Sequence, residues 1–278
     1  SGTQGWPALW QRRSALSWAL WPVSQLYRAL MATRAALYQT GLLHSEHPGR
    51  PVIVVGNVVA GGSGKTPVVM ALVQHLQGLG LRPGVVSRGY GRTTQGCLAV
   101  LPASTASEVG DEPLLLALKT QCPVVVDPNR TAAVRYLLDK YDSQIIISDD
   151  GLQHYRMGRA VEIVVIDGFR GLGNGFCLPA GPLREGKKRL SEVDFVICNE
   201  GLWDKAYTMH LSPGSPVHIK TGQSYGLEHF QSQVAAVAGI GNPQRFYATL
   251  NQLGIRYKPY SYSDHFQFTA NDLNYPEI

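Results

Sequence analysis

A glycine-rich turn between a strand pattern and a helical pattern constrains this chain more than any other feature. Residues 51–55 read as a short strand rich in β-branched side chains, and residues 59–66 read Val-Ala-Gly-Gly-Ser-Gly-Lys-Thr. Apolar residues then recur at helical spacing from 69 to 76. In this setting glycines let backbone N–H groups surround phosphate oxygens at a helix N-terminus. The pattern predicts a phosphate-binding loop in an α/β fold, and a glycine-rich loop without a ligand is the alternative.

The residues of this loop have separate expected roles. Lys65 is expected to reach the β- and γ-phosphates of a nucleotide, and the Thr66 hydroxyl to bind Mg²⁺. The strict pattern has a glycine five residues before Gly64, where this chain has Val59, and the adjacent glycine pair supplies flexibility instead. ATP and Mg²⁺ are the expected cofactors, and the predicted nucleotide-binding residues are Val59, Ala60, Gly61, Gly62, Ser63, Gly64, Lys65 and Thr66.

Short strand patterns and helical patterns alternate along the rest of the chain. Strands are expected at 84–87, 123–126, 145–148, 162–166, 195–198, 234–238 and 255–260, and helices at 112–118, 130–138 and 246–253. This alternation predicts an α/β fold, with a mainly parallel sheet and helices on both faces, plus a smaller C-terminal lobe. The expected parts are an N-terminal amphipathic segment (1–45), a phosphate-loop core (46–205) and the smaller lobe (206–278).

Two aspartates follow one of the buried strand patterns. Asp149 and Asp150 come directly after residues 145–148. Ligands bind at the carboxyl ends of strands in open α/β sheets, and carboxylates placed there suit Mg²⁺. The pair is therefore predicted to hold the metal directly or through water, with an ordinary Asp-Asp-Gly turn as the alternative.

Other polar residues stay ambiguous from the sequence pattern. Asp111 and Glu112 stand at an expected helix start, where acids also cap the helix and complement its dipole. Arg88 follows a strand, a place that suits either a phosphate or a surface carboxylate. His154 and His265 are isolated histidines, which are more often structural than catalytic.

The basic charge of the chain is concentrated in an aromatic N-terminal segment. The 278 residues carry a formal net charge of +5, and the first 50 contain five arginines and one glutamate. Four of the five tryptophans lie within the first 21 residues. After Pro22, apolar residues recur at helical spacing from 23 to 37. Tryptophan and arginine on an amphipathic helix are typical of a membrane interface, and a helix docked on its own domain is the alternative.

Charge, hydropathy and cysteine spacing exclude several classes of protein. A small, local basic excess does not indicate a nucleic-acid-binding protein. The apolar stretch 15–23 is far shorter than the ~20 residues of a membrane-spanning helix. The four cysteines are widely spaced, which disfavours a disulfide scaffold or a zinc module and favours a reducing compartment.

A set of short stretches occurs in an order that resembles one family. The stretches are 55–57, 60–67, 86–91, 110–113, 149–154, 176–185, 238–243 and 264–265. Together they resemble the tetraacyldisaccharide 4′-kinase family of lipid A biosynthesis, over nearly the whole chain. The family also lacks the strict glycine at the position of Val59. This departure from the strict pattern therefore supports the resemblance.

The resemblance implies an activity and roles for the ambiguous residues. The family transfers the γ-phosphoryl group of ATP to the 4′-hydroxyl of a tetraacyldisaccharide 1-phosphate, giving lipid IVA, at the cytoplasmic face of the Gram-negative inner membrane. Asp111 matches the catalytic base and His265 the histidine paired with it, from the other lobe. The catalytic set is Asp111, His265, Lys65, Asp149 and Asp150; the metal set is Thr66, Glu112 and Asp149; Arg88 and His154 are expected at the substrate.

Two further points remain open at this stage. The family continues beyond residue 278, so the smaller lobe is expected to be incomplete. Membrane-associated ATPases that dimerise to position cell components share a similar loop and an amphipathic helix. Their loop has a signature lysine where this chain has Ala60, and their membrane helix is commonly C-terminal. The kinase is the favoured interpretation and this ATPase class the alternative.

Overall fold

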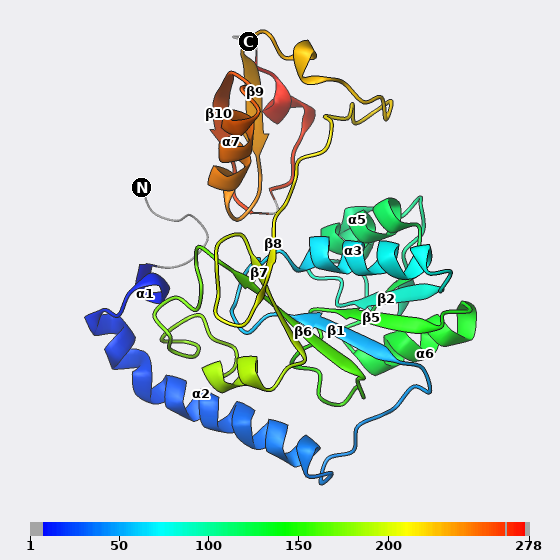
Figure 1. Cartoon of the computed structure of the whole chain (residues 1–278), viewed down its shortest axis with the longest axis vertical. Helices are drawn as coiled ribbons and strands as arrows, with labels where there is room; N and C mark the ends of the chain where they lie inside the picture. Colours follow the sequence, from blue (N-terminus) through cyan, green and yellow to red (C-terminus); the bar gives the residue numbers. More distant parts are fainter. Residues whose placement is uncertain (1–7, 265, 276–278) are drawn as a thin grey trace. The chain divides into compact units, whose positions relative to one another are not determined.

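The computed structural model describes residues 8–264 and 266–275 (Figure 1). Contacts divide the chain into a larger compact unit, Leu9–His210, and a smaller unit that begins at Leu211. His265 lies outside the described residues. The larger unit contains the phosphate-loop pattern, the Asp149-Asp150 pair and the N-terminal helix.

The larger unit is built on an eight-stranded sheet in the order β3-β4-β2-β5-β1-β6-β7-β8. The strands are β1 (Val52–Gly56), β2 (Pro83–Ser87), β3 (Leu98–Ala99), β4 (Val124–Val126), β5 (Ile145–Asp149), β6 (Val161–Asp167), β7 (Phe195–Asn199) and β8 (Tyr207–Met209). All neighbours pair in parallel except the short edge strand β3, which runs antiparallel to β4. The predicted sheet is confirmed, and only the short edge strands β3 and β8 have no sequence signal.

Helices cover both faces of this sheet (Figure 1). The chain moves outward from β1 through α3 (Lys65–Gly78) to β2, and through α4 (Ala106–Val109) and α5 (Asp111–Thr120) to β4. It returns through α6 (Arg130–Lys140) to β5, which lies between β2 and β1. Because parallel crossovers are right-handed, this reversal of direction puts α6 on the face opposite α3 and α5. The carboxyl ends of β1 and β5 are therefore neighbours at a switch point, where such sheets bind ligands.

The core of the larger unit consists mainly of β-branched side chains from the central strands. Val55, Val85, Val126 and Ile147 are fully buried and pack against Val69 of α3. Strands buried on both faces read as continuous apolar runs, which is why the sequence locates them within one or two residues.

The N-terminal segment forms α1 (Ala8–Gln11) and a 25-residue helix α2 (Ala15–Gln39). A capping box between Ser14 and Ser17 begins α2, and the helix continues through Pro22. The sequence pattern, by contrast, indicates a helix that resumes only after Pro22. A proline inside a helix removes one hydrogen bond, and contacts on both sides of it hold the helix here. Trp18 packs edge-on against Phe176 at 5.0 Å, and the Ser24 hydroxyl donates to the Cys177 carbonyl at 2.7 Å.

Helix α2 leaves an apolar row uncovered on its outward side. Four apolar side chains are each more than half exposed, namely Leu16, Val23, Leu26 and Leu30. Their spacing of seven, three and four residues places them on one face of the helix. One side of α2 therefore docks on its own unit, as the alternative interpretation expects, and the membrane contact of the exposed side stays a prediction. No helix within the described residues has the length and apolar character needed to cross a membrane.

The smaller unit contains a parallel βαβ element, as the sequence predicts. Strands β9 (Val234–Ala238) and β10 (Tyr257–Ser261) pair in parallel, and α7 (Pro243–Gln252) connects them. Its core is formed by Ala236, Ala238 and Tyr247. The remaining regular elements are the short 3₁₀ helices η1 (Lys187–Ser191) in the larger unit, and η2 (Leu227–His229) and η3 (Ala270–Leu273) in the smaller one.

Candidate active site

The phosphate loop connects β1 to the N-terminus of α3, as predicted. Helix α3 begins at Lys65 with Gly64 as its N-cap in the left-handed region, at φ 90°. A Cβ atom at Gly64 would lie 2.2 Å from Nδ2 of Asn199, so only glycine fits there. The loop glycines Gly61 and Gly62 are exposed, which leaves room for a ligand above the start of α3.

Val59 has a structural reason to replace the usual glycine. It is buried and forms an antiparallel bridge with Leu183 of a segment that we call the strap, residues 176–189. Backbone hydrogen bonds flank this bridge, from Ala60 N–H to the Pro182 carbonyl at 2.8 Å and from Arg184 N–H to the Val58 carbonyl at 2.8 Å. The first half of the loop therefore behaves as an edge strand, and a β-branched residue suits it better than glycine.

Asp149 ends β5 directly beside β1, where Val55 is its register partner. It is 1% exposed and accepts a hydrogen bond from the Ser87 hydroxyl at 3.0 Å. Burial, reinforced by the negative charge of Glu112, raises the pKa of Asp149 to about 6. A carboxylate so shielded from water is stabilised by a nearby cation. This environment is the one expected of a group that binds or orients a metal ion.

Asp150 binds two cations from different parts of the larger unit. Lys65 Nζ lies 3.6 Å from its Oδ1, and Arg184 Nη1 donates to both of its carboxylate oxygens at 3.1 Å. Burial would raise the pKa of Asp150, but Lys65 and Arg184 outweigh it and lower the pKa below its usual value. Asp150 therefore links the phosphate loop to the strap through one negative charge.

Three residues near this centre are missed by the sequence analysis. Arg184 stands in a stretch where no local sequence pattern assigns it to the catalytic set. Asn199 is fully buried at the end of β7 and donates from Nδ2 to the Ser63 carbonyl at 3.1 Å. Arg130 is also buried and donates to the Asp149 carbonyl at 3.1 Å. The helical pattern of α6 locates Arg130 without giving any sign that its side chain turns toward the site.

His154 and Arg88, the residues expected at the substrate, differ in their burial. His154 follows Asp150 on the same loop, and burial together with the positive charge of Arg130 lowers its pKa to about 4, so it is neutral at pH 7. Arg88 is exposed just beyond β2 and contributes a positive potential at both His154 and Arg130.

Asp111 and Glu112 occupy the first turn of α5, as predicted. Gly110, the N-cap, has φ 94°, and a Cβ atom there would lie 2.9 Å from the Tyr90 carbonyl oxygen. This close approach fixes the start of α5 against the Arg88–Gly91 turn. The pairing of Asp111 with His265 stays a prediction, because His265 lies outside the described residues.

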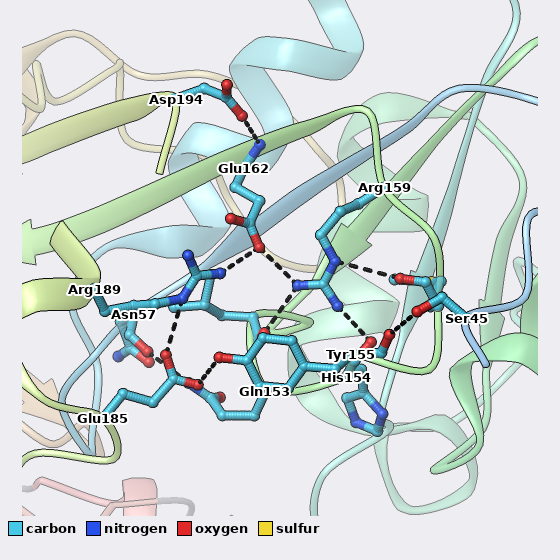
Figure 2. A network of polar contacts seen from close by, with 12 residues as sticks. Ser45, Asn57, Gln153, His154, Tyr155, Arg159, Glu162, Glu185, Arg189 and Asp194 are labelled. Carbon is cyan, nitrogen blue, oxygen red and sulfur yellow. Dashed lines mark hydrogen bonds and ion pairs between the residues drawn. The ribbon is translucent and has the colours of Figure 1, made fainter. Parts of the chain in front are cut away.

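A buried network of charged groups supports the loop that contains His154 (Figure 2). Arg159 donates to the Leu152 carbonyl at 2.9 Å and to the His154 carbonyl, and it pairs with Glu162 at 2.8 Å. Arg189 pairs with Glu162 and, at 3.2 Å, with Glu185 of the strap. The network ties the His154 loop, β6 and the strap together.

The chemistry of the site fits a nucleotide with Mg²⁺. Within the described residues, several buried oxygens at this edge of the sheet have no hydrogen-bond partner, among them Asn57 Oδ1, Ser63 Oγ, Ser148 Oγ and Asp149 Oδ1. Buried polar atoms without partners are rare and indicate a missing ligand or water. No group of three or more His, Cys, Asp and Glu side chains in the described chain is arranged to hold a metal alone. Mg²⁺ in phosphoryl-transfer sites needs only one or two protein ligands, because phosphates and water complete its shell.

Comparison with known proteins assigns the chain to a family. The family model described as "Tetraacyldisaccharide-1-P 4'-kinase" matches residues 16–277. The chain is 54% identical to the tetraacyldisaccharide 4′-kinase of Legionella pneumophila (strain Lens) over 267 residues, which are 96% of this chain and 82% of the relative. The chain belongs to the tetraacyldisaccharide 4′-kinase family.

Other members of the kinase family agree with this assignment. The Haemophilus influenzae (strain 86-028NP) kinase is 48% identical over 95% of this chain and 80% of its own length. A crystal structure of the Aquifex aeolicus kinase LpxK in complex with ATP superposes with a TM-score of 0.79 at 30% identity, covering 91% of this chain and 85% of that chain. Membership of a kinase family removes the support for the dimerising ATPase as the alternative.

The pKa of Asp149 leads to a prediction about stability and pH. Because its pKa is raised from 3.8 to about 6, the folded state binds the proton more tightly than the unfolded state. The contribution of Asp149 to stability is greatest below about pH 4 and is lost as the pH rises through 6. Replacing Asp149 by Asn removes this loss, so the variant should gain up to about 3 kcal/mol over the wild type between pH 4 and pH 7.

Urea unfolding of both proteins across this pH range measures the difference. Asp139→Asn is the control, because Asp139 is an exposed residue of α6. A constant difference between Asp149→Asn and the wild type from pH 4 to pH 7 would contradict the raised pKa.

Proposed function

We propose that this chain transfers the γ-phosphoryl group of ATP to the 4′-hydroxyl of a tetraacyldisaccharide 1-phosphate in lipid A biosynthesis, giving lipid IVA. The observation that carries the proposal is the joint occurrence of a phosphate loop, the carboxylates of Asp149 and Asp150 at the adjacent strand end, and a family match over residues 16–277. Phosphoryl transfer needs these parts because its catalysis is mostly positioning and charge stabilisation.

The chain's own residues supply the positive charge and the positioning. Lys65 and the N-terminus of α3 face the phosphates, and Lys65 exchanges its contact with Asp150 for a phosphate oxygen when ATP binds. Thr66, Glu112 and Asp149 are the proposed protein contacts of Mg²⁺, which when bound offsets the charge on the transferred group. Asp150 then keeps Arg184 aimed at the same space.

Asp111 is the proposed catalytic base, with His265 as its partner. A sugar hydroxyl is a very weak acid, so a carboxylate that accepts its proton as the new P–O bond forms lowers the barrier. Arg88 and neutral His154 are proposed to contact the sugar or its phosphate. An uncharged imidazole suits a sugar hydroxyl, because it offers one hydrogen-bond donor and one acceptor.

The outward face of α2 is the proposed membrane contact, at the cytoplasmic face of the inner membrane. Leu16, Val23, Leu26 and Leu30 form this face, and the arginines of the segment attract anionic lipid. A tetraacylated substrate resides in the bilayer, so a bound surface helix brings the phosphate loop to it. In this scheme residues 1–45 associate with the membrane, 46–205 form the kinase core and 206–278 the smaller lobe.

The kinase assay combines ATP, Mg²⁺ and the tetraacyldisaccharide 1-phosphate in mixed micelles, with detection of phosphorylated lipid. The wild type should phosphorylate the lipid, and Asp111→Asn should lower kcat by about 10²–10⁴-fold, since the base acts in the transition state. Asp139→Asn should retain wild-type activity. ATP hydrolysis without phosphorylated lipid would contradict the kinase assignment, and a fully active Asp111→Asn would contradict its role as base.

Membrane contact predicts an effect of charge on the outward face of α2. Leu26 and Leu30 are 63% and 61% exposed, so their replacement by Glu should not disturb packing. The double variant Leu26→Glu/Leu30→Glu should bind anionic liposomes at least about tenfold more weakly, because it removes two leucines from the lipid interface and adds negative charge that anionic lipid repels.

Leu79→Glu is the matched control for the membrane experiment. Leu79 is also 63% exposed and lies at the C-cap of α3. Liposome co-sedimentation should distinguish the two variants, while ATP affinity stays the same in both. Equal liposome binding by the double variant and the wild type would show that α2 only packs against its own unit.

A further inference from the structure

The backbone around His154 is held by side chains rather than by regular secondary structure. Residues 152–155 belong to no helix or strand, and all four of their carbonyls accept hydrogen bonds from side chains. Arg159 donates to the first carbonyl at 2.9 Å and also to the third. Arg34 of α2 donates to the second at 3.2 Å, and the Ser45 hydroxyl donates to the fourth at 2.8 Å. Because its carbonyls are bound in this way, the loop presents the His154 side chain from a fixed backbone.

Arg159 makes the largest share of these contacts, and it depends on a carboxylate behind it. Its guanidinium is a planar fork of donors, which lets it bind two carbonyls and one carboxylate together. Nη1 of Arg159 donates to Oε1 of Glu162 at 2.8 Å, and the two side chains are only 14% and 13% exposed. A guanidinium with so little water around it needs a countercharge. Glu162 therefore keeps Arg159 turned inward onto the loop.

The same oxygen of Glu162 binds a second arginine (Figure 2). Nη2 of Arg189 donates to Oε1 of Glu162, and Arg189 also pairs with Glu185 at 3.2 Å. The Tyr155 hydroxyl donates to Glu185 at 2.9 Å. The ring centre of Tyr155 lies 5.3 Å from the guanidinium carbon of Arg159 and 5.8 Å from that of Arg189. The charges of the two arginines and the two glutamates cancel, so each ion of the network is stabilised by the others.

Glu162 itself stands on a rigid part of the larger unit. It belongs to β6, where Val54 of β1 is its register partner, and its backbone N–H donates to Asp194 Oδ2 at 2.8 Å. A sheet strand fixes a side chain more precisely than a loop does. The carboxylate of Glu162 is thus a fixed point from which the arginine reaches the less regular His154 loop.

We propose that Glu162 is a positioning residue for phosphoryl transfer. Its carboxylate holds Arg159 on the carbonyls of the His154 loop, and the loop in turn sets where the imidazole meets the acceptor. Glu162 acts only through Arg159 and the loop backbone, so it is not a catalytic residue. The inference rests on the proposed function, in which His154 contacts the sugar or its phosphate.

The test measures kcat and KM for the lipid, and KM for ATP, in variants of Glu162 and His154. Glu162→Gln keeps the shape of the side chain and removes its charge, whereas Glu162→Asp keeps the charge. Both are compared with His154→Ala and with the double variant His154→Ala/Glu162→Gln. Glu46→Gln is the matched control, because Glu46 also pairs with two arginines, the exposed Arg135 and Arg156.

Glu162→Gln should lower kcat/KM for the lipid by about tenfold, the effect of losing one hydrogen bond between charged groups, and leave KM for ATP within about twofold. Glu162→Asp should recover part of this loss, and Glu46→Gln should behave as the wild type. In the His154→Ala background, Glu162→Gln should change kcat/KM by less than about twofold, because the imidazole that it positions is absent. A role in stability alone would instead give the same loss in both backgrounds.

Amide hydrogen exchange of residues 151–157 measures the hold on the loop without an assay of activity. Exchange there should be about tenfold faster in Glu162→Gln than in the wild type, since the loop opens more often when Arg159 is released. Glu46→Gln should exchange at the wild-type rate. If Glu162→Gln is too unstable to purify, Glu162→Asp takes its place in both measurements, with smaller changes in the same direction.

Several results would overturn the inference. Additive effects of Glu162→Gln and His154→Ala would show that Glu162 does not act through the imidazole. Wild-type kinetics in Glu162→Gln or in His154→Ala, or unchanged exchange at 151–157, would equally contradict it. If the wild type does not phosphorylate the lipid, the proposed function fails, and the exchange measurement still decides whether Glu162 holds the loop.

Discussion

The ion pairs of Asp150 are the interaction on which the rest of this site depends. The half-buried Asp150 carboxylate contacts the phosphate-loop Lys65 and the strap Arg184. Asp150 has a left-handed backbone, at φ 50°, which turns its side chain away from the end of β5 toward these cations. Removing Lys65 or Arg184 would leave part of the Asp150 charge without a partner. For a group with little access to water, this loss destabilises the protein by more than a surface ion pair stabilises it. The same charge therefore joins the phosphate loop to the strap.

The strap connects the Asp150 ion pair to other parts of the larger unit. It pairs with Val59 on the phosphate loop, and it holds α2 through contacts such as the Tyr27 hydroxyl donating to the Arg184 carbonyl at 3.1 Å. Behind it, Arg189 is bound to Glu162 and Glu185. Helix α2, the phosphate loop and Glu162 of β6 thus all contact the strap.

Local patterns predict the parts that depend on local structure. The strand–loop–helix unit around Lys65 and the acids after β5 follow from short-range spacing, and the parallel sheet follows from alternating buried runs. Arg184 and Asn199 could not be found in this way, because they act 34 residues from Asp150 and 136 residues from Ser63. The continuity of α2 through Pro22 also depends on distant contacts, which compensate for the missing hydrogen bond. The role of Asp111 rests on family resemblance, since its position fits a helix cap equally well.

The measurement that tests the account most directly is the single-turnover rate of lipid phosphorylation by Asp150→Asn at saturating ATP, with ATP affinity measured alongside. If Asp150 organises both cations for phosphoryl transfer, the transfer rate should fall by about 10²-fold or more, while ATP affinity changes by only a few fold. A transfer rate equal to that of the wild type would contradict the account, because the reaction would then not depend on the carboxylate that joins the phosphate loop to the strap.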